Sequence, residues 1–176
     1  MNAAASIAVA PPAGALREDV NAELVRHLYR QASGSIVTLF AVALILAFVL
    51  WDIFPHSLIL GWLAALAAVS VLRFAQIGAF RRRNPATQEC RRWGLMSAAG
   101  SALVGGVWAL ACVLFLDPSQ PLSLIALTVI LMGIAAGAVV NLSSYLPSFW
   151  AVVGPSMGAL IAVLLWHGGP ISNTIA

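Results

Sequence analysis

The sequence predicts an all-α integral membrane protein: a bundle of five transmembrane helices that follows an N-terminal amphipathic interfacial helix. Of its 176 residues, 61% are hydrophobic and only 9% are charged, whereas soluble domains average about 25% charged residues. Apolar stretches of the length that crosses a bilayer as a helix, ~20 residues, recur along the chain. Arginines gather in two short segments beside these stretches. This composition excludes a soluble domain, a disordered chain and a disulfide-stabilised scaffold.

Two segments precede the first apolar stretch. Residues 1–15 are small and alanine-rich and include a Pro-Pro pair, a composition that predicts a disordered tail. In residues 16–33 apolar side chains recur every fourth position, which predicts an amphipathic helix. These positions are Leu16, Val20, Leu24 and Leu28. We expect this helix to lie in the membrane interface.

The predicted transmembrane bundle covers residues 34–167. Turn residues or charges separate five apolar segments, each long enough for the hydrocarbon core. The predicted spans are residues 35–54, 58–80, 94–116, 122–140 and 148–166. Residues 168–176 then form a short tail on the outer side, which we interpret as the start of a truncated sixth span.

The charges orient the bundle. Every basic residue is an arginine, and all but Arg73 lie in residues 17–30 or 81–92. Basic loops stay in the cytoplasm, so the N-terminus is expected inside and the end of this chain outside. Asp52 and Asp117 then fall on the outer side. A basic loop also suits contact with anionic lipid, and no folded module that would bind nucleic acid is present.

Aromatic and small residues give further expectations about helix contacts. Aromatic rings near the predicted ends favour the membrane interface, namely Tyr29, Trp51, Phe54, Trp93, Phe149, Trp150 and Trp166. Trp62 and Trp108 lie inside spans and are expected to pack between helices. Stripes of small residues let helices approach closely, namely Gly133 with Gly137, Gly154 with Gly158, and Ser97 with Ser101 and Gly105. They predict packing within one chain or a homodimer. Pro155 should kink the fifth span.

Arg73 is the one ionisable residue well inside a predicted span. Intramembrane charge is expensive, which favours a function in anion binding or switching. The alternative is that its long side chain reaches the cytoplasmic interface.

Other polar residues are weaker candidates. Asp52 and His56 lie in the first outer loop, where carboxylate and imidazole groups suit pH sensing or a divalent cation. No close histidine pair accompanies them, so we predict solvated loop residues and no metal site. Asn141 and Tyr145, with the two serines between them, form either a pocket or hinge or a plain turn.

The sequence contains no catalytic or nucleotide-binding motif. We therefore expect no cofactor and no enzymatic activity from this chain alone. Cys90 and Cys112 lie in a loop and in a span respectively, at depths that predict no disulfide.

Several short runs resemble the multi-span N-terminal membrane regions of bacterial sensor histidine kinases, often hybrid ones, and of GGDEF/EAL cyclic-di-GMP signalling proteins. These runs are residues 24–31, Trp51 with Pro55-His56, Gly61-Trp62 with Arg73, residues 80–83, residues 91–94, residues 106–108, residues 133–137 and residues 145–147. The resemblance implies a sensory region in the bacterial inner membrane that drives a cytoplasmic kinase or cyclase output domain.

A cytoplasmic output domain needs an even number of spans when the N-terminus is inside. Five spans leave the end of the chain outside, which predicts a fragment that ends before a sixth span and its output domain. The alternatives are a small transporter or channel subunit and a membrane assembly factor.

Overall fold

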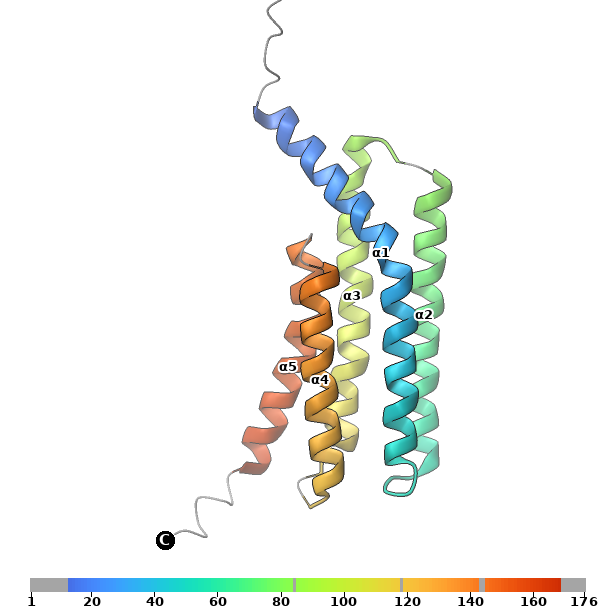
Figure 1. Cartoon of the computed structure of the whole chain (residues 1–176), viewed down its shortest axis with the longest axis vertical. Helices are drawn as coiled ribbons and strands as arrows, with labels where there is room; N and C mark the ends of the chain where they lie inside the picture. The colour runs from blue at the N-terminus through green and yellow to red at the C-terminus, as the bar shows by residue number, and fades with distance from the viewer. Residues whose placement is uncertain (1–12, 84, 118, 143–144, 169–176) are drawn as a thin grey trace, which may run out of the picture.

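The computed structural model describes residues 13–168 except for positions 84, 118, 143 and 144. The described part is entirely helical and contains no strand. The five helices run roughly side by side (Figure 1). They are α1 (Ala13–Leu50), α2 (His56–Arg83), α3 (Thr87–Phe115), α4 (Pro121–Leu142) and α5 (Leu146–Gly168). Of the predicted tails at residues 1–15 and 168–176, residues 1–12 and 169–176 lie outside the described residues. Residues 13–15 begin α1 and Gly168 ends α5, so these four residues are helical and do not belong to tails.

Each of the five helices is long and apolar enough to cross a membrane. The helices begin and end near turn-forming or charged residues. For example, Pro121 is the first residue of α4, a position where the missing proline N–H costs no helical hydrogen bond. In the turn before it, Asp117 Oδ1 accepts hydrogen bonds from the backbone N–H and hydroxyl of Ser119 at 2.8 and 2.7 Å. The five predicted spans are confirmed as helices.

The predicted interfacial helix and the first span form one continuous helix of 38 residues. The part of it that is apolar enough to cross a membrane is Ala32–Leu50. In Figure 1 the part of α1 before this span tilts away from the rest, and glycine and serine at positions 33–35 are residues at which helices commonly bend. The predicted boundary at residue 33 is therefore a bend at most, because backbone hydrogen bonding continues through it.

Two hydrophobic clusters hold the bundle together. The first, which we call the main cluster, contains residues of all five helices and includes the large buried side chains Trp62, Trp108 and Phe115. The second, the basic-end cluster, joins the N-terminal half of α1 to α2 and α3 around Tyr29, Phe80, Cys90 and Trp93. Cys90, expected in a loop, is buried within α3, because this helix already begins at Thr87. Cys112 belongs to the main cluster, so the two cysteines lie at different depths along α3, and both are free.

Aromatic contacts order both clusters. In the main cluster Trp62 and Trp108 meet edge to face with ring centroids 5.4 Å apart, and the Trp62 indole donates to the Val107 carbonyl at 2.9 Å. Both tryptophans pack between helices, as predicted. In the basic-end cluster the ring of Tyr29 stacks on Phe80 at 3.9 Å and meets Trp93 edge-on at 6.2 Å. Tyr29 and Trp93, expected at the interface, are therefore buried.

The contact between α3 and α5 depends on Gly105. A Cβ atom there would lie 2.6 Å from the Val152 carbonyl oxygen and 2.7 Å from that of Ala151. Pro155 cannot donate to the Ala151 carbonyl four residues earlier, and this carbonyl faces the bare backbone of Gly105. The α5 helix runs through Pro155 without a break. The predicted stripe of small residues on α3 therefore packs against α5 at Gly105.

The other two glycine stripes pack differently from the prediction. A Cβ atom at Gly133, Gly137, Gly154 or Gly158 would meet nothing within 4 Å. Among the described residues, no neighbouring helix therefore packs closely against these four glycines, and the expected contact within the chain is not made there. The alternative, contact between two copies, stays a prediction.

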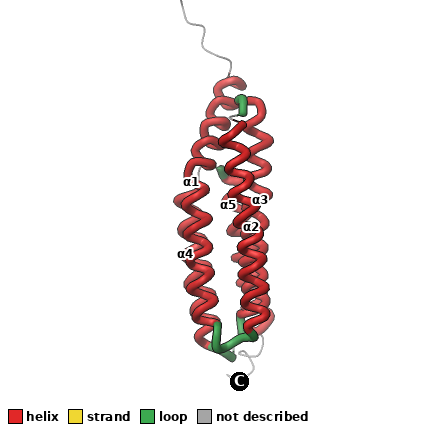
Figure 2. The backbone as a smooth tube through the Cα atoms, turned by 90° about the vertical axis from the view of Figure 1, so that its right-hand side faces the viewer, coloured by secondary structure: helices red, strands yellow, loops and turns green. Residues whose placement is uncertain are grey.

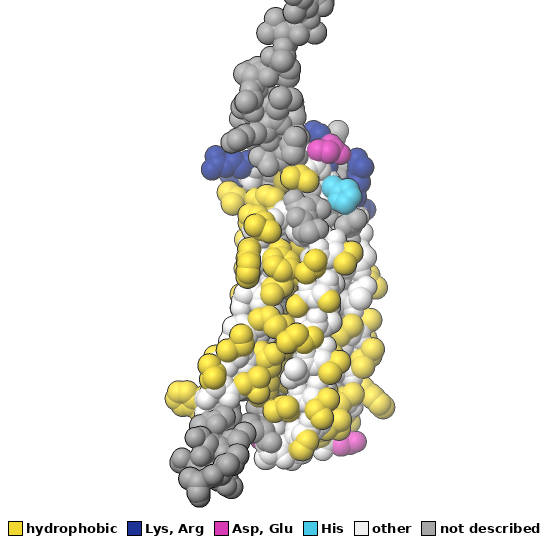
Figure 3. Space-filling model, turned by 60° about the vertical axis from the view of Figure 1, so that its left-hand side comes forward, with side chains coloured by type: hydrophobic (Ala, Val, Ile, Leu, Met, Phe, Trp, Pro, Cys, Tyr) yellow, Lys and Arg dark blue, Asp and Glu magenta, His cyan; other side chains and the backbone are white. Residues whose placement is uncertain are grey.

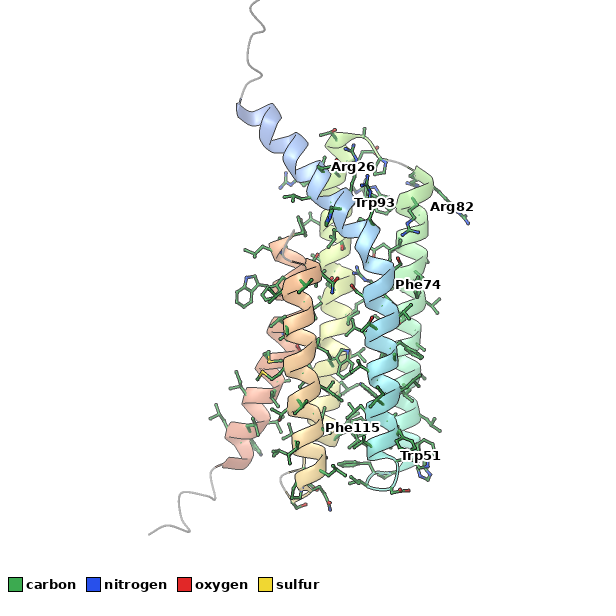
Figure 4. All side chains as sticks on the ribbon, viewed as in Figure 1. Arg26, Trp51, Phe74, Arg82, Trp93 and Phe115 are labelled. Carbon is green, nitrogen blue, oxygen red and sulfur yellow. The ribbon has the colours of Figure 1, made fainter. Side chains whose placement is uncertain are left out.

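The surface of the bundle is divided into an apolar belt and two polar ends. Large apolar side chains around the belt are highly exposed, among them Phe48 at 83%, Val140 at 75% and Leu165 at 74%. Figure 3 shows hydrophobic side chains along the length of the molecule and charged ones at its ends. In Figure 4 Arg26 and Arg82 lie at one end, and Trp51 and Phe115 at the other. The two arginine-rich segments therefore share one end, and the belt is the surface that a lipid bilayer would cover.

Candidate functional site

Arg73 lies inside the bundle, with only 7% of its surface exposed. Its Nη1 donates hydrogen bonds to the backbone oxygen of Ser97 at 3.0 Å and to the Ser97 hydroxyl at 3.4 Å. The same nitrogen donates to Gln76 Oε1 at 3.4 Å. The guanidinium thus bridges α2 and α3 inside the bundle. The alternative, in which the side chain reaches the cytoplasmic interface, stays a prediction.

A chain of hydrogen bonds leads from Arg73 to α1. The side-chain amide of Gln76 donates to the Tyr29 hydroxyl at 3.2 Å, and this hydroxyl donates to the Trp93 carbonyl at 3.1 Å. Burial raises the pKa of Tyr29 to about 12, although the nearby Arg73 charge and the Gln76 hydrogen bond lower it. The phenol is therefore neutral at physiological pH, and one polar layer connects α1, α2 and α3.

Gly100 provides the space that Arg73 occupies. A Cβ atom at this position would lie 2.6 Å from Arg73 Cδ, 2.8 Å from Nη1 and 2.9 Å from Gln76 Oε1. Any other residue would push the guanidinium away from α3. Sequence reasoning missed Gly100 and Gln76. The spacing of Arg73 and Gln76, three positions apart on one helix, was the available signal.

A cavity of about 600 Å³ adjoins this polar layer. Its wall is formed mainly by α1 and α4, with Arg73, Ser101, Val104 and Val152 from the other three helices. Four lining residues, Gly34, Thr38, Val129 and Gly133, are themselves exposed at the surface of the bundle. Figure 2 shows α1 and α4 neighbouring each other on the same side of the bundle. The cavity therefore opens sideways between these two helices.

Several polar atoms around the cavity lack hydrogen bonds. Arg73 Nε, Ser101 Oγ and Ser35 Oγ are buried and have no partner within the described structure, and all three residues line the cavity. Most buried polar atoms in proteins have a partner, and an exception calls for an explanation such as a bound molecule. Two other such atoms, Trp108 Nε1 and Ser148 Oγ, belong to residues that do not line the cavity. Three of the five buried polar atoms without a partner among the described residues thus belong to residues of the cavity wall.

The structure brings together only some of the predicted candidates. Asn141 lines the cavity, and its amide donates to the Gly137 carbonyl at 2.9 Å. Tyr145 is not among the residues that line the cavity and packs against Gly94 and the basic-end cluster. The two serines between them lie outside the described residues. The hinge interpretation of this segment stays a prediction, whereas Asn141 shares the cavity with Arg73.

The remaining candidates lie elsewhere. Asp52 is exposed in the turn between α1 and α2. His56, expected in that loop, is exposed as the first residue of α2, and its imidazole stacks on the Trp51 ring at 4.3 Å. Pro155 is exposed on α5. The residues that the structure describes include no group of three His, Cys, Asp or Glu side chains that would hold a metal ion. These positions form no common site with Arg73.

The fold and site define the chain as an all-helical protein with five helices suited to a bilayer and one buried cation beside a lateral cavity. No known protein family, curated protein or solved structure matches the chain. The geometry of the described residues is therefore the basis for a function.

Proposed function

We propose that the chain is the membrane-embedded sensory region of a bacterial signalling protein, in which occupation of the Arg73 cavity changes the position of α1. The orientation proposed is that of the charge pattern, with the arginine-rich end in the cytoplasm. The observation that carries the proposal is the hydrogen-bonded layer, since it connects the cavity wall directly to a helix that extends beyond the membrane.

The coupling follows from competition for the same donors. A ligand that accepts hydrogen bonds from Arg73 competes with Ser97 and Gln76, the present acceptors of Nη1. When Gln76 loses Arg73, its amide is free to turn, and its hydrogen bond to Tyr29 changes. A ligand with different affinity for the two arrangements shifts their populations.

The helix α1 is suited to pass this change out of the membrane. Its described part before the span, residues 13–31, corresponds to a helix about 28 Å long at 1.5 Å per residue. The basic-end cluster fixes this part to α2 and α3 through Tyr29. A kinase or cyclase output domain of the full-length protein would receive the change through α1 or through a helix that follows α5.

A homodimer is part of the proposal. Gly154 and Gly158 are exposed on α5 and have open space in place of a side chain. Small residues at this spacing suit close contact with a helix of a second copy. Chemical crosslinking in membranes should give a dimer whose yield falls in the Gly154→Leu variant.

The experiment that tests the function begins with the gene. Its reading frame past the codon of Ala176 should encode a sixth span and an output domain, and the output activity of the full-length protein should change about threefold or more in the Gln76→Leu variant. Leucine keeps the volume but removes both hydrogen bonds of Gln76. Gln120→Leu is the matched control, because Gln120 is exposed in the turn before α4.

Two results would contradict the proposal. One is an unchanged output in a folded Gln76→Leu protein. The other is solute uptake by liposomes that contain the chain, which would support the alternative of a small transporter. A stop codon directly after Ala176 would favour the transporter or the membrane assembly factor.

A further inference from the structure

The Arg73 charge is not neutralised by any side chain that the structure describes. The ion pair that the described residues form, between Arg26 and Glu23 of α1 at 3.4 Å, does not involve Arg73. The acceptors around Arg73 are a carbonyl, a hydroxyl and an amide oxygen, and Tyr29 keeps its proton. A buried cation without a counter-charge is expensive, so the site favours an anion.

The cavity that adjoins this cation is apolar over most of its length. Along α1 it extends from Leu28 to Val42, which is about 21 Å at 1.5 Å per helical residue. Of its polar residues, Asn141 and Arg73 lie toward the basic end and Ser35 lies about halfway along, whereas Val42 and Val129 line the other end. Thr38 lies in the half nearer Val42, but its hydroxyl already donates to the Gly34 carbonyl at 3.1 Å. A ligand that matches this wall has a polar head near the basic end and an apolar tail toward the middle of the bundle.

The volume limits the size of that ligand. One water molecule or a group of similar size takes roughly 30 Å³, so a cavity of about 600 Å³ holds about 20 non-hydrogen atoms. This is close to the size of a long-chain fatty acid, whereas a two-chain phospholipid has more than twice as many atoms. The opening between α1 and α4 faces the lipid region, from which such a molecule would enter.

We infer that the cavity binds a single-chain anionic amphiphile, a long-chain carboxylate, with its head group on the Arg73 guanidinium and its chain between α1 and α4. The planar guanidinium matches the two oxygens of a carboxylate. A small rotation of the Arg73 side chain would let Nε share this contact, and Ser101 would supply a hydroxyl donor. This inference rests on the proposed function only for its consequence, the change in output.

Binding of radiolabelled palmitate to the full chain in phosphatidylcholine nanodiscs tests the inference. We expect saturable binding that unlabelled palmitate displaces. Hexadecanol has the chain without the charge and should compete about tenfold less well or worse, because hydrogen bonds to charged groups are the strong ones. Acetate has the charge without the chain and should not compete.

Variants separate the two halves of the site. Arg73→Met should weaken palmitate binding by about tenfold or more, since it removes the charge and keeps the length of the side chain. Gly137→Leu should weaken it similarly, because the leucine fills a lining position where a side chain meets no protein atom. Gly61→Leu is the matched control, since Gly61 also has open space but lies outside the cavity.

Three outcomes would overturn the inference. They are no saturable binding, equal competition by hexadecanol and palmitate, and displacement of palmitate by phosphatidylglycerol at the same concentration, which would indicate a lipid head-group site. Palmitate binding tests the site, and the output activity of the full-length protein tests the proposed function. If palmitate binds but leaves the output of the full-length protein unchanged, the function is wrong and the site remains. If palmitate does not bind while Gln76→Leu still alters output, the function remains.

Discussion

Two neighbouring glycines on α3 should respond oppositely to the same substitution. Alanine at Gly105 would place a methyl group 2.6 and 2.7 Å from two backbone oxygens of α5, atoms that move only if the whole helix moves. At Gly106 the methyl group would meet nothing within 4 Å. Gly105→Ala should therefore destabilise the bundle, and Gly106→Ala should stabilise it.

The magnitude follows from two opposing effects. Alanine is favoured over glycine in a helix by up to about 1 kcal/mol, and this gain applies at both positions. Overpacking a close contact costs about 1–3 kcal/mol, and this cost applies at Gly105 alone. The two variants should differ in their free energies of unfolding by about 1–3 kcal/mol, the overpacking cost.

Unfolding in detergent micelles, followed by far-ultraviolet circular dichroism against added denaturing detergent, measures this difference. Both variants carry the same alanine, so effects of composition and micelle partition cancel. Equal midpoints for Gly105→Ala and Gly106→Ala would show that α3 and α5 are not in backbone contact in the membrane-like environment. The close approach of Gly105 to the Ala151 and Val152 carbonyls would then be wrong.

Three further predictions concern single side chains. In a Tyr145→Phe protein Tyr29 is the one tyrosine left, so its phenolate absorbance should appear only near pH 12. Because the folded pKa is raised from 10.0, the stability contributed by the neutral phenol is complete below about pH 10 and is lost as the pH rises toward about 12. Trp62→Phe should lower the free energy of unfolding by about 1 kcal/mol, because it removes the indole donor to Val107. Gly154→Leu should raise the free energy of unfolding of the monomer by up to about 1 kcal/mol, since leucine is favoured over glycine in a helix and no protein atom obstructs that position.

The helix ends could be predicted because the sequence marks them chemically. Pro55, Pro121 and the Arg81–Arg83 run end or begin apolar stretches, and the observed helices begin or end within a few residues of them. The continuity of α1 could not be predicted, because the change from amphipathic to apolar patterning at residue 33 marks a change of surroundings. It does not require a break in backbone hydrogen bonding.

The site could be predicted only in part. A cation inside an apolar stretch identifies Arg73 from sequence, since charge in that position is costly. Ser97, which accepts from Arg73, and Tyr29, which accepts from Gln76, lie on other helices and could not be assigned from sequence. Gln76 lies on the same helix as Arg73, but a spacing of three residues is too common to be diagnostic. Small-residue stripes show that a close approach is allowed, but not which helix uses it. Gly105 makes such an approach to α5, whereas Gly137 lines a cavity.

The polar layer shares Tyr29 and Trp93 with the basic-end cluster, and its position limits which motions the bundle can make. Sliding α1 along its axis by one helical turn, about 5.4 Å, would carry the Tyr29 hydroxyl out of reach of both Gln76 and the Trp93 carbonyl, to which it lies within 3.2 and 3.1 Å. A tilt or a rotation of α1 about this layer keeps at least one of these contacts. Under the proposed function, the layer would therefore act as a pivot, and a change at the cavity would reach the far end of α1 as a tilt or rotation of the helix and not as a shift along its axis.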